Sequence, residues 1–492
     1  MPPAEPGATA FFVAVLGVLL ALSAILTRVA SRSGLPVVLV FLALGMLAGS
    51  EGLGGIWFDD YALSFRLGVV ALVLILFEGG LNTPLDSLRR FLGPSGVLAS
   101  VGVAATTGLV ALAARGMGLS WGEALLFGAV VSSTDAAAVF SVLRGSGLKL
   151  KRRVGATLEI ESGLNDPMAV ILTFALAGAL AGGAAPGWRI ALDVVVQFGV
   201  GGAAGVAIGM AGRWILARFM PTASGLYPVM SLALAFLAFG LPTLFFGSGF
   251  LAVYLAAAVM GDARLPQRGV LMRSHDFIAW FSQVIMFLTL GLLVFPSRLL
   301  EVGWGGLAIV LAGVLLARMV VVALLLTPFR YPWREQLFIG WVGLRGAVPI
   351  VLATYPVLVG VPGADRIFHL VFFVVVVSVV VQGSTVGALA RRLGLHVPAA
   401  PAPPAVLEVL SNRALESDIV SFHLHPAAAA TGIRAADMPM PQGASILLVV
   451  RDRALLAPSP GLVLEPEDHV YVVCRDEHRP ELRLLFGQIG EE

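Results

Sequence analysis

The chain has 492 residues, of which 58% are apolar and 13% are charged, with a mean hydropathy of +0.92. Soluble domains carry about 25% charged residues, so this composition excludes an ordinary soluble enzyme and indicates a polytopic membrane protein. The single cysteine, Cys474, excludes a disulfide framework and a cysteine-rich metal site. Residues 1–392 hold 25 basic and 17 acidic residues and residues 393–492 hold 7 and 13, so two different bodies are expected to join near Pro398.

Apolar windows that can cross a bilayer occur thirteen times in the first body. They cover residues 9–29, 35–49, 62–80, 95–114, 121–142, 155–181, 188–212, 227–246, 249–261, 275–295, 303–327, 335–356 and 367–389. The first window is long and follows Glu5 instead of a basic stretch, so we expect a retained helix and not a signal peptide. The pattern predicts an all-α membrane domain over residues 1–392 with about 13 transmembrane helices.

The basic residues predict the orientation of these helices. If the acidic second body is cytoplasmic, the N-terminus lies outside, the inner loops hold 18 Lys and Arg residues, and the outer loops hold 5. This alternation follows the positive-inside rule. The composition, rich in alanine, glycine and arginine, favours a bacterial cytoplasmic (inner) membrane.

A second, smaller domain follows the membrane part. Residues 393–405 are rich in proline and alanine and predict an extended linker. β-rich runs and a terminal helix then predict a small cytoplasmic α+β domain over residues 406–492. These elements are expected at about 406–410, 418–425, 445–451, 469–474 and 477–487.

Several ionisable side chains fall inside the apolar windows, where a charge costs between about 3 and more than 10 kcal/mol. They include Glu78, Asp135, Glu161, Asp166, Arg318 and Arg345. For any single one of these residues, a charge pair that only holds helices together is as good an interpretation as a functional site. Several acids beside interrupted helices favour a functional site instead.

The spacing within residues 155–181 sharpens this interpretation. Glu161 and Asn165 are four residues apart, as are Ser162 and Asp166, so all four project onto one broad stripe of a helix. Pro167 then removes a backbone donor and frees a carbonyl. Carboxylate, hydroxyl, amide and carbonyl oxygens are the hard ligands that a desolvated monovalent cation needs.

Two windows are poor continuous helices. Residues 121–142 contain the polar run SerSerThrAsp, and residues 335–356 contain Gly343, Gly346 and Pro349 around Arg345. Interrupted helices at corresponding places in two halves are typical of transporters built from inverted repeats, with an ion site at the midplane. Asp135 and Arg345 are placed to neutralise the half-helix ends.

At these residues the chain resembles the monovalent cation:proton antiporter-1 family, the NhaP-type exchangers, over about residues 9–390. The similarity is carried by ThrAspAlaAlaAlaValPhe (134–140), GluSerGlyLeuAsnAspPro (161–167), GlyPheLeuAlaValTyrLeuAla (249–256), GlnValIleMetPheLeuThrLeuGlyLeuLeuVal (283–294) and GlyLeuArgGlyAlaValPro (343–349). The resemblance implies 13 helices with six-helix inverted repeats, a dimerisation domain, a mobile core bundle and a homodimer.

The same resemblance implies roles for individual residues. Asp166 would be the central carrier of cation and proton, and Asn165 before it marks the electroneutral branch. The residues expected in or near the ion site are Asp135, Thr134, Ser162, Glu78 and Asn165. Glu161 would pair with Arg345 to hold the core together, and Arg318 would stabilise the crossing of the broken helices.

The tail resembles the RCK C-terminal (TrkA-C type) domain, chiefly through residues 461–473. That domain is regulatory, which implies a possible small-molecule regulator. No GlyxGlyxxGly motif follows residue 390, so a nucleotide cofactor is not implied. Among NhaP-type exchangers the appended domain is typical of the potassium/proton subgroup.

The sequence thus predicts an electroneutral potassium/proton antiporter, without catalysis, cofactor or nucleic-acid partner, in which cation and proton compete for Asp166. Three alternatives stay open: a sodium/proton antiporter of the same family, a cation channel regulated by its tail, and a membrane-tethered sensor. The sensor leaves the costly buried acids unexplained, and the channel lacks a filter motif.

Overall fold

The structure is a computed structural model. It describes residues 5–33, 36–116, 118–183, 188–218, 225–263, 265–299, 313–398, 405, 407, 417–452 and 454–487. The chain divides into two compact units. The first comprises Met1–Ile215, Pro228–Ala263 and Met272–Val397, and the second comprises Leu216–Tyr227, Arg264–Leu271 and Pro398–Glu492.

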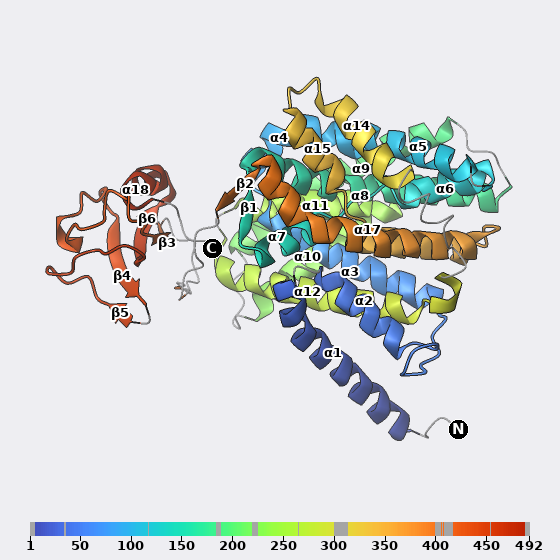
Figure 1. The fold of residues 1–492 in the computed structure, drawn as a ribbon, viewed down its shortest axis with the longest axis horizontal. Helices are drawn as coiled ribbons and strands as arrows, with labels where there is room; N and C mark the ends of the chain where they lie inside the picture. Colours follow the sequence, from blue (N-terminus) through green and yellow to red (C-terminus); the bar gives the residue numbers. More distant parts are fainter. Residues whose placement is uncertain are drawn as a thin grey trace. The chain divides into compact units, whose positions relative to one another are not determined.

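The first unit is a bundle of helices that run side by side (Figure 1). Its helices up to residue 145 are α1 (Gly7–Ser33), α2 (Val37–Ala48), α3 (Tyr61–Asn82), α4 (Leu85–Val97), the π-helix η1 (Leu98–Gly102), α5 (Val103–Gly116), α6 (Trp121–Val130) and α7 (Ala136–Gly145). Those that follow are α8 (Arg152–Ala181), α9 (Arg189–Arg218), α10 (Leu226–Leu244), α11 (Gly249–Gly261), α12 (Arg268–Leu292), α14 (Leu316–Leu326), α15 (Trp333–Trp341), α16 (Ala347–Leu358) and α17 (Ala364–Leu393).

The helical prediction is confirmed. Each of the thirteen windows contains helix, although residues 303–312 lie outside the described residues. Within the part of the chain that the structure describes, eight helical stretches are long and apolar enough to cross a membrane, and shorter apolar helices accompany them. The protein is therefore a membrane protein.

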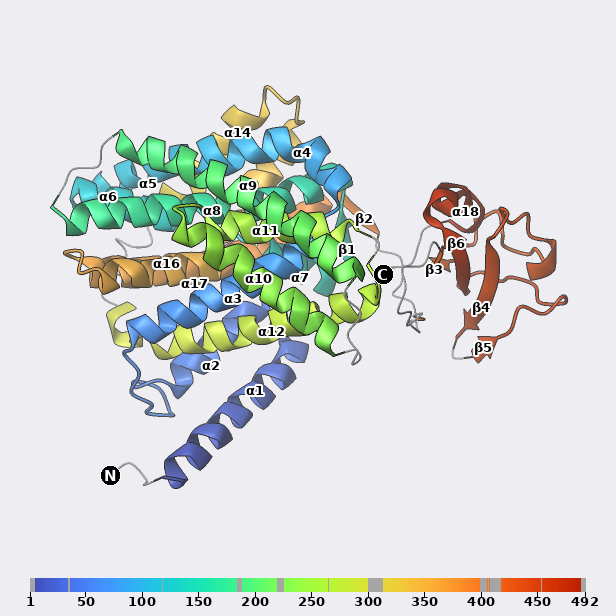
Figure 2. The ribbon, with the colours of Figure 1, turned by 180° about the vertical axis from the view of Figure 1, so that it is seen from behind.

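The two interrupted helices are also confirmed. Window 121–142 forms α6 and α7, which are separated at residues 131–135, and window 335–356 forms α15 and α16, which are separated at residues 342–346. Polar side chains in the first break and glycines in the second favour non-helical backbone. Helix α8 stays continuous through Pro167 and contacts α4, α6, α11 and α16, which places it at the centre of the bundle (Figure 2).

The second unit contains a four-stranded antiparallel sheet with strand order β3-β6-β4-β5. The strands are β3 (Ser417–His423), β4 (Ser445–Arg451), β5 (Ala454–Leu456) and β6 (His469–Arg475), and α18 (Arg479–Phe486) follows. Phe422 of β3 and Phe486 of α18 lie in its core with ring centroids 5.4 Å apart. This confirms the predicted α+β domain, while the strand expected at 406–410 lies largely outside the described residues.

Two short strands pair at the end of the membrane part. Strand β1 (Leu148–Leu150) pairs with β2 (His396–Pro398), and the N–H of Lys151 donates to the carbonyl of Leu395 at 2.9 Å. The first residues of the predicted linker 393–405 are therefore ordered by strand pairing. Of the linker's later residues, only 405 is among those described.

Candidate ion-binding site at the crossing of two broken helices

The breaks of α6–α7 and α15–α16 touch each other. The backbone N–H of Asp135 donates to the carbonyl of Leu344 at 2.7 Å. A Cβ atom added to Gly346 would lie 2.0 Å from Oδ2 of Asp135, so only glycine leaves room for that carboxylate. Two non-helical segments thus cross in the interior of the bundle, where their backbone groups satisfy each other.

Charged side chains bind backbone groups at the two breaks. Asp135 is the N-cap of α7, and its carboxylate accepts the N–H of Ala138 at 3.0 Å. Arg345 is fully buried, and its Nη1 donates to the carbonyls of Ser132 and Ser133 at 2.9 and 2.8 Å. An anion at a helix N-terminus is favourable, and so is a cation beside the buried carbonyls that follow the C-terminus of α6.

Asp166 lies in α8 directly against the break of α6–α7. Its side chain is only 8% exposed, and its Oδ1 accepts a hydrogen bond from the hydroxyl of Ser133. The neighbouring Asn165 donates through Nδ2 to Oγ1 of Thr134 at 2.6 Å. One turn earlier, the hydroxyl of Ser162 donates to the carbonyl of Thr134 at 3.0 Å. The predicted stripe of α8 therefore holds the break in place.

The arrangement offers oxygen ligands and a proton acceptor at one point. Carboxylate oxygens come from Asp166 and Asp135, and hydroxyl oxygens come from Ser162 and Thr134. Asp135 and Ser162 are half-buried, whereas Asp166 and Thr134 are buried. Hard oxygens in a largely dehydrated setting suit an alkali cation, and the same carboxylate can hold a proton instead.

The predicted pair between Glu161 and Arg345 is wrong. Glu161 forms a bidentate ion pair with Arg318 of α14, with Nη1 to Oε1 at 2.5 Å and Nη2 to Oε2 at 2.7 Å. Arg345 is electrostatically attracted to Glu161, but its position inside a break directs its Nη1 to two carbonyls of the other break. Arg318 lies in a continuous helix and is free to face α8. A Cβ on Gly343 would lie 3.1 Å from Nε of Arg318, so Arg318 lies beside the second break, and its stabilising role at the crossing stays a prediction.

Glu78 belongs to a different group of acids. Its Oε1 accepts a hydrogen bond from Nδ2 of Asn82 at 2.5 Å. Its charged neighbours include Asp276, Glu159 and Arg144. The charged neighbour of Asp166 is instead Asp135. The structure therefore does not bring Glu78 together with the other predicted site residues.

Three residues of this environment were missed by the sequence analysis. The hydroxyl of Ser378 in α17 accepts the N–H of Arg345 at 3.1 Å and donates to Gln382. Gln382 in turn donates to the carbonyl of Trp341, the last residue of α15, at 2.6 Å. Two polar residues four apart in an apolar helix were the available signal. Glu159, seven residues before Asp166 and thus on nearly the same face of α8, is the third.

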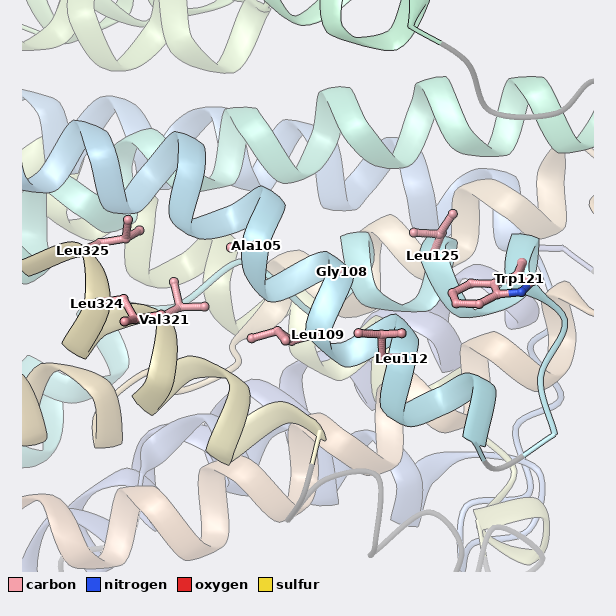
Figure 3. Close-up of a pocket in the computed structure, with 9 residues that line it drawn as sticks. All are labelled: Ala105, Gly108, Leu109, Leu112, Trp121, Leu125, Val321, Leu324 and Leu325. Carbon is pink, nitrogen blue, oxygen red and sulfur yellow. The ribbon is translucent and has the colours of Figure 1, made fainter.

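An apolar groove lies elsewhere among the described residues. It is a groove of about 530 Å³ lined by apolar side chains of α5, α6 and α14, among them Leu109, Trp121 and Leu324 (Figure 3). These three side chains are also substantially exposed. A groove without charged groups, on helices that cross a bilayer, offers no ligand for a cation, so the buried crossing is the candidate site.

Comparisons with known proteins identify the family of the chain. Residues 18–392 match the family model described as "Sodium/hydrogen exchanger, transmembrane", and residues 419–487 match the TrkA-C domain. The chain is 43% identical to the "K(+)/H(+) antiporter NhaP" of Alkalimonas amylolytica, over 96% of this chain and 83% of the relative. It is 40% identical to the "K(+)/H(+) antiporter NhaP2" of Shewanella sp. (strain ANA-3), over 97% of this chain and 83% of the relative.

Solved structures support the fold independently. The sodium proton antiporter MjNhaP1 from Methanocaldococcus jannaschii, solved at pH 8, superposes with a TM-score of 0.68 at 23% identity, covering 78% of this chain and 99% of that one. Because the match over residues 18–392 and the near full-length relatives cover both the membrane bundle and the crossing, the chain belongs to the sodium/hydrogen exchanger family and carries a C-terminal TrkA-C domain.

Proposed function

We propose that the protein exchanges potassium for protons across a membrane, with both ions competing for Asp166. The observation that carries the proposal is a buried carboxylate bonded by Ser133 at the crossing of two broken helices. The names of the 40% and 43% identical relatives, both potassium/proton antiporters, favour potassium as the cation.

Competition for one carboxylate supplies the coupling. A cation on ionised Asp166 and a proton on the same group give the loaded site the same charge, which favours one-for-one exchange without net charge movement. The second acid nearby, Asp135, is engaged with the N-terminus of α7, and Asn165 is uncharged. An empty, charged core is costly to move through lipid, so a loaded site is required for each crossing and leak stays small.

The test is transport by the full chain in liposomes that contain a pH dye. Added potassium is expected to move protons without a requirement for membrane potential. The Asp166→Asn variant, which keeps the size of the side chain, is expected to lose this exchange by at least about 100-fold while its melting temperature stays near that of the parent. Exchange that persists in this variant would place the carrier elsewhere.

Two alternatives are separated by the same assay. A sodium/proton antiporter is favoured by the "Na(+)/H(+) antiporter NhaS2" of Synechocystis sp., 26% identical over 77% of this chain and 70% of the relative. A series of lithium, sodium, potassium and rubidium in the same liposomes decides between cations. A tail-regulated channel would instead pass potassium current and move protons only indirectly.

The assembly proposed is a homodimer in a bacterial inner membrane, with the N-terminus outside, no catalysis and no cofactor. Helix α1 supports a partner copy because its apolar span is only 6% buried, with Phe11 and Phe12 more than 60% exposed. The TrkA-C domain supports regulation by a small molecule in the cytoplasm. Light scattering of the detergent-solubilised protein measures the oligomeric state.

A further inference from the structure

Aromatic rings join α3 to three other helices on one side of Asp166. Phe65 of α3 lies 6.2 Å from Phe174 of α8 and 5.7 Å from Tyr355 of α16, measured between ring centroids. Phe174 and Tyr355 are themselves 4.2 Å apart. One turn earlier in α3, Tyr61 meets Phe368 of α17 edge to face at 5.4 Å. We call these five residues the aromatic seam.

The seam lies on the side of the membrane where the loops are poor in arginine. Phe174 follows Asp166 by eight residues, which is about 12 Å along a helix. Phe65 is near the start of α3 and Tyr355 is near the end of α16. Phe368 is fully buried and the other four side chains are half-buried.

The opposite side of Asp166 has a different character. Glu159 lies seven residues before Asp166, and its carboxylate accepts a hydrogen bond from the hydroxyl of Thr83 at 3.2 Å. Glu78 is an electrostatic neighbour of Glu159, and both carboxylates are half-buried. A hydrated cation is favoured beside these acids, whereas between aromatic rings it would lose water without gaining carboxylate ligands.

Helix α3 packs against different helices at its two ends. Near the seam, a Cβ on Gly68 would lie 2.7 and 2.8 Å from the methyl groups of Val351 in α16. At the other end, a Cβ on Gly80 would lie 2.6 Å from the carbonyl of Tyr254 in α11. The first half of α3 is thus packed tightly against the broken helix and the second half against α11.

We infer that the aromatic seam is the barrier that closes the path between Asp166 and the arginine-poor side, and that it opens between α3 and the helices α8 and α16. This inference rests on the proposed exchange function, because a carrier site must be open to one side at a time. Phe174 and Tyr355 flank the crossing on its own helices and move with it. Phe65 stays with α3, so the contacts of Phe65 are the ones that break.

Cross-linking of two cysteine pairs tests this division. In a Cys474→Ser background, Phe65→Cys with Tyr355→Cys places thiols on opposite sides of the seam, and Phe174→Cys with Tyr355→Cys places both on the same side. A short bifunctional thiol reagent is applied to the full-length protein in liposomes, and maleimide labelling measures the remaining free thiols. We expect the first cross-link to lower exchange at least ten-fold, with recovery on reduction, and the second to leave it within two-fold.

Alanine substitution gives an independent readout. Phe65→Ala removes ring contacts that exist only in the closed arrangement, so the apparent KM for the cation should change about three- to ten-fold, in opposite directions, when measured from the two sides. Phe281→Ala is the matched control, because Phe281 stacks on Phe277 at 6.1 Å within α12 and lies outside the seam. A purely structural role would lower the melting temperature without this asymmetry.

The outcomes separate the inference from the function it rests on. Full exchange by the cross-linked Phe65–Tyr355 pair, or failure of that pair to cross-link while the Phe174–Tyr355 pair does, overturns the seam. Equal KM changes on both sides for Phe65→Ala overturn it as well. Absence of potassium-driven proton movement in the unmodified chain would count against the exchange function, while the cross-linking yields of the two cysteine pairs would still test the seam.

Discussion

Two buried arginines in this protein perform different tasks because of where their backbones lie. Arg318 is part of the regular helix α14, so its guanidinium is available to bind Glu161 through two parallel contacts. Arg345 is part of a break and donates hydrogen bonds to two non-helical carbonyls of the other break. Both uses satisfy a charge that lipid would otherwise leave uncompensated.

A double-mutant cycle is expected to show that Glu161 pairs with Arg318. Glu161→Gln or Arg318→Gln alone leaves one buried charge unpaired and should cost about 3 to 5 kcal/mol of stability. The double variant should be less destabilised than the sum of the two singles. Thermal unfolding in detergent measures these effects. The matched control combines Glu161→Gln with Arg345→Gln, and a larger coupling there than with Arg318 would contradict the structure.

At the scale of elements, the crossing depends on a close approach between two breaks. The carboxylate of Asp135 occupies the space that a side chain at position 346 would take. Asp135 has to stay there because it caps α7, and its backbone N–H is held by Leu344. Glycine at this position is thus required by packing and not by an unusual φ angle, since Gly346 has φ −96°.

Gly346→Ala is therefore expected to displace Asp135 and lower the exchange rate at least about ten-fold, since such a clash costs of the order of 1 to 3 kcal/mol. Gly178→Ala in α8 is the control, because a Cβ there would meet no atom within 4 Å. Initial rates of potassium-driven proton movement provide the measurement. Equal rates for the two variants would show that the crossing tolerates a methyl group.

The tail sheet contains a histidine pair whose protonation is expected to affect the stability of the domain. His423 and His469 are cross-strand partners of β3 and β6, with ring centroids 4.9 Å apart. Burial lowers the pKa of His469 below its ordinary value, the neighbouring His423 lowers it further, and Glu467 and Asp468 oppose the shift. Because a lowered histidine pKa means that the unfolded chain binds protons more readily, the domain should lose stability as the pH falls below about 6.5.

Hydrogen exchange of the full-length protein tests this expectation. Protection of β3 and β6 should decrease between pH 7 and pH 5.5, after correction for the intrinsic exchange rate. His469→Phe should remove much of the decrease, while His425→Asn, at an exposed position outside the strands, should not. If protection from hydrogen exchange in the parent protein does not change with pH, a destabilising histidine is ruled out.

At the scale of the whole molecule, the crossing and the tail belong to different compact units. The residues of the crossing all belong to the first unit, and the TrkA-C domain occupies residues 419–487. Glu161, Asp166 and Arg345 therefore do not depend on the tail for their contacts. We therefore expect the first unit to carry out transport and the tail to modify it.

Removal of residues 398–492 is accordingly expected to leave potassium-driven proton movement within about three-fold of the parent at saturating cation. Its dependence on cytoplasmic pH or on a small-molecule regulator should change instead. The liposome assay, repeated at several internal pH values with and without the tail, measures this. An inactive truncated protein of normal yield and melting temperature would show that the tail takes part in transport.

The sequence by itself determined the membrane class, the helices, both breaks and the stripe of α8 that carries Ser162, Asn165 and Asp166, because lipid imposes strong, local rules on composition and periodicity. Only the tertiary structure decided which arginine holds Glu161, that Glu78 joins other acids, and that Ser378 and Gln382 support the second break. Those contacts join residues far apart in the chain, and charge and spacing along one helix do not specify which neighbouring helix supplies the partner.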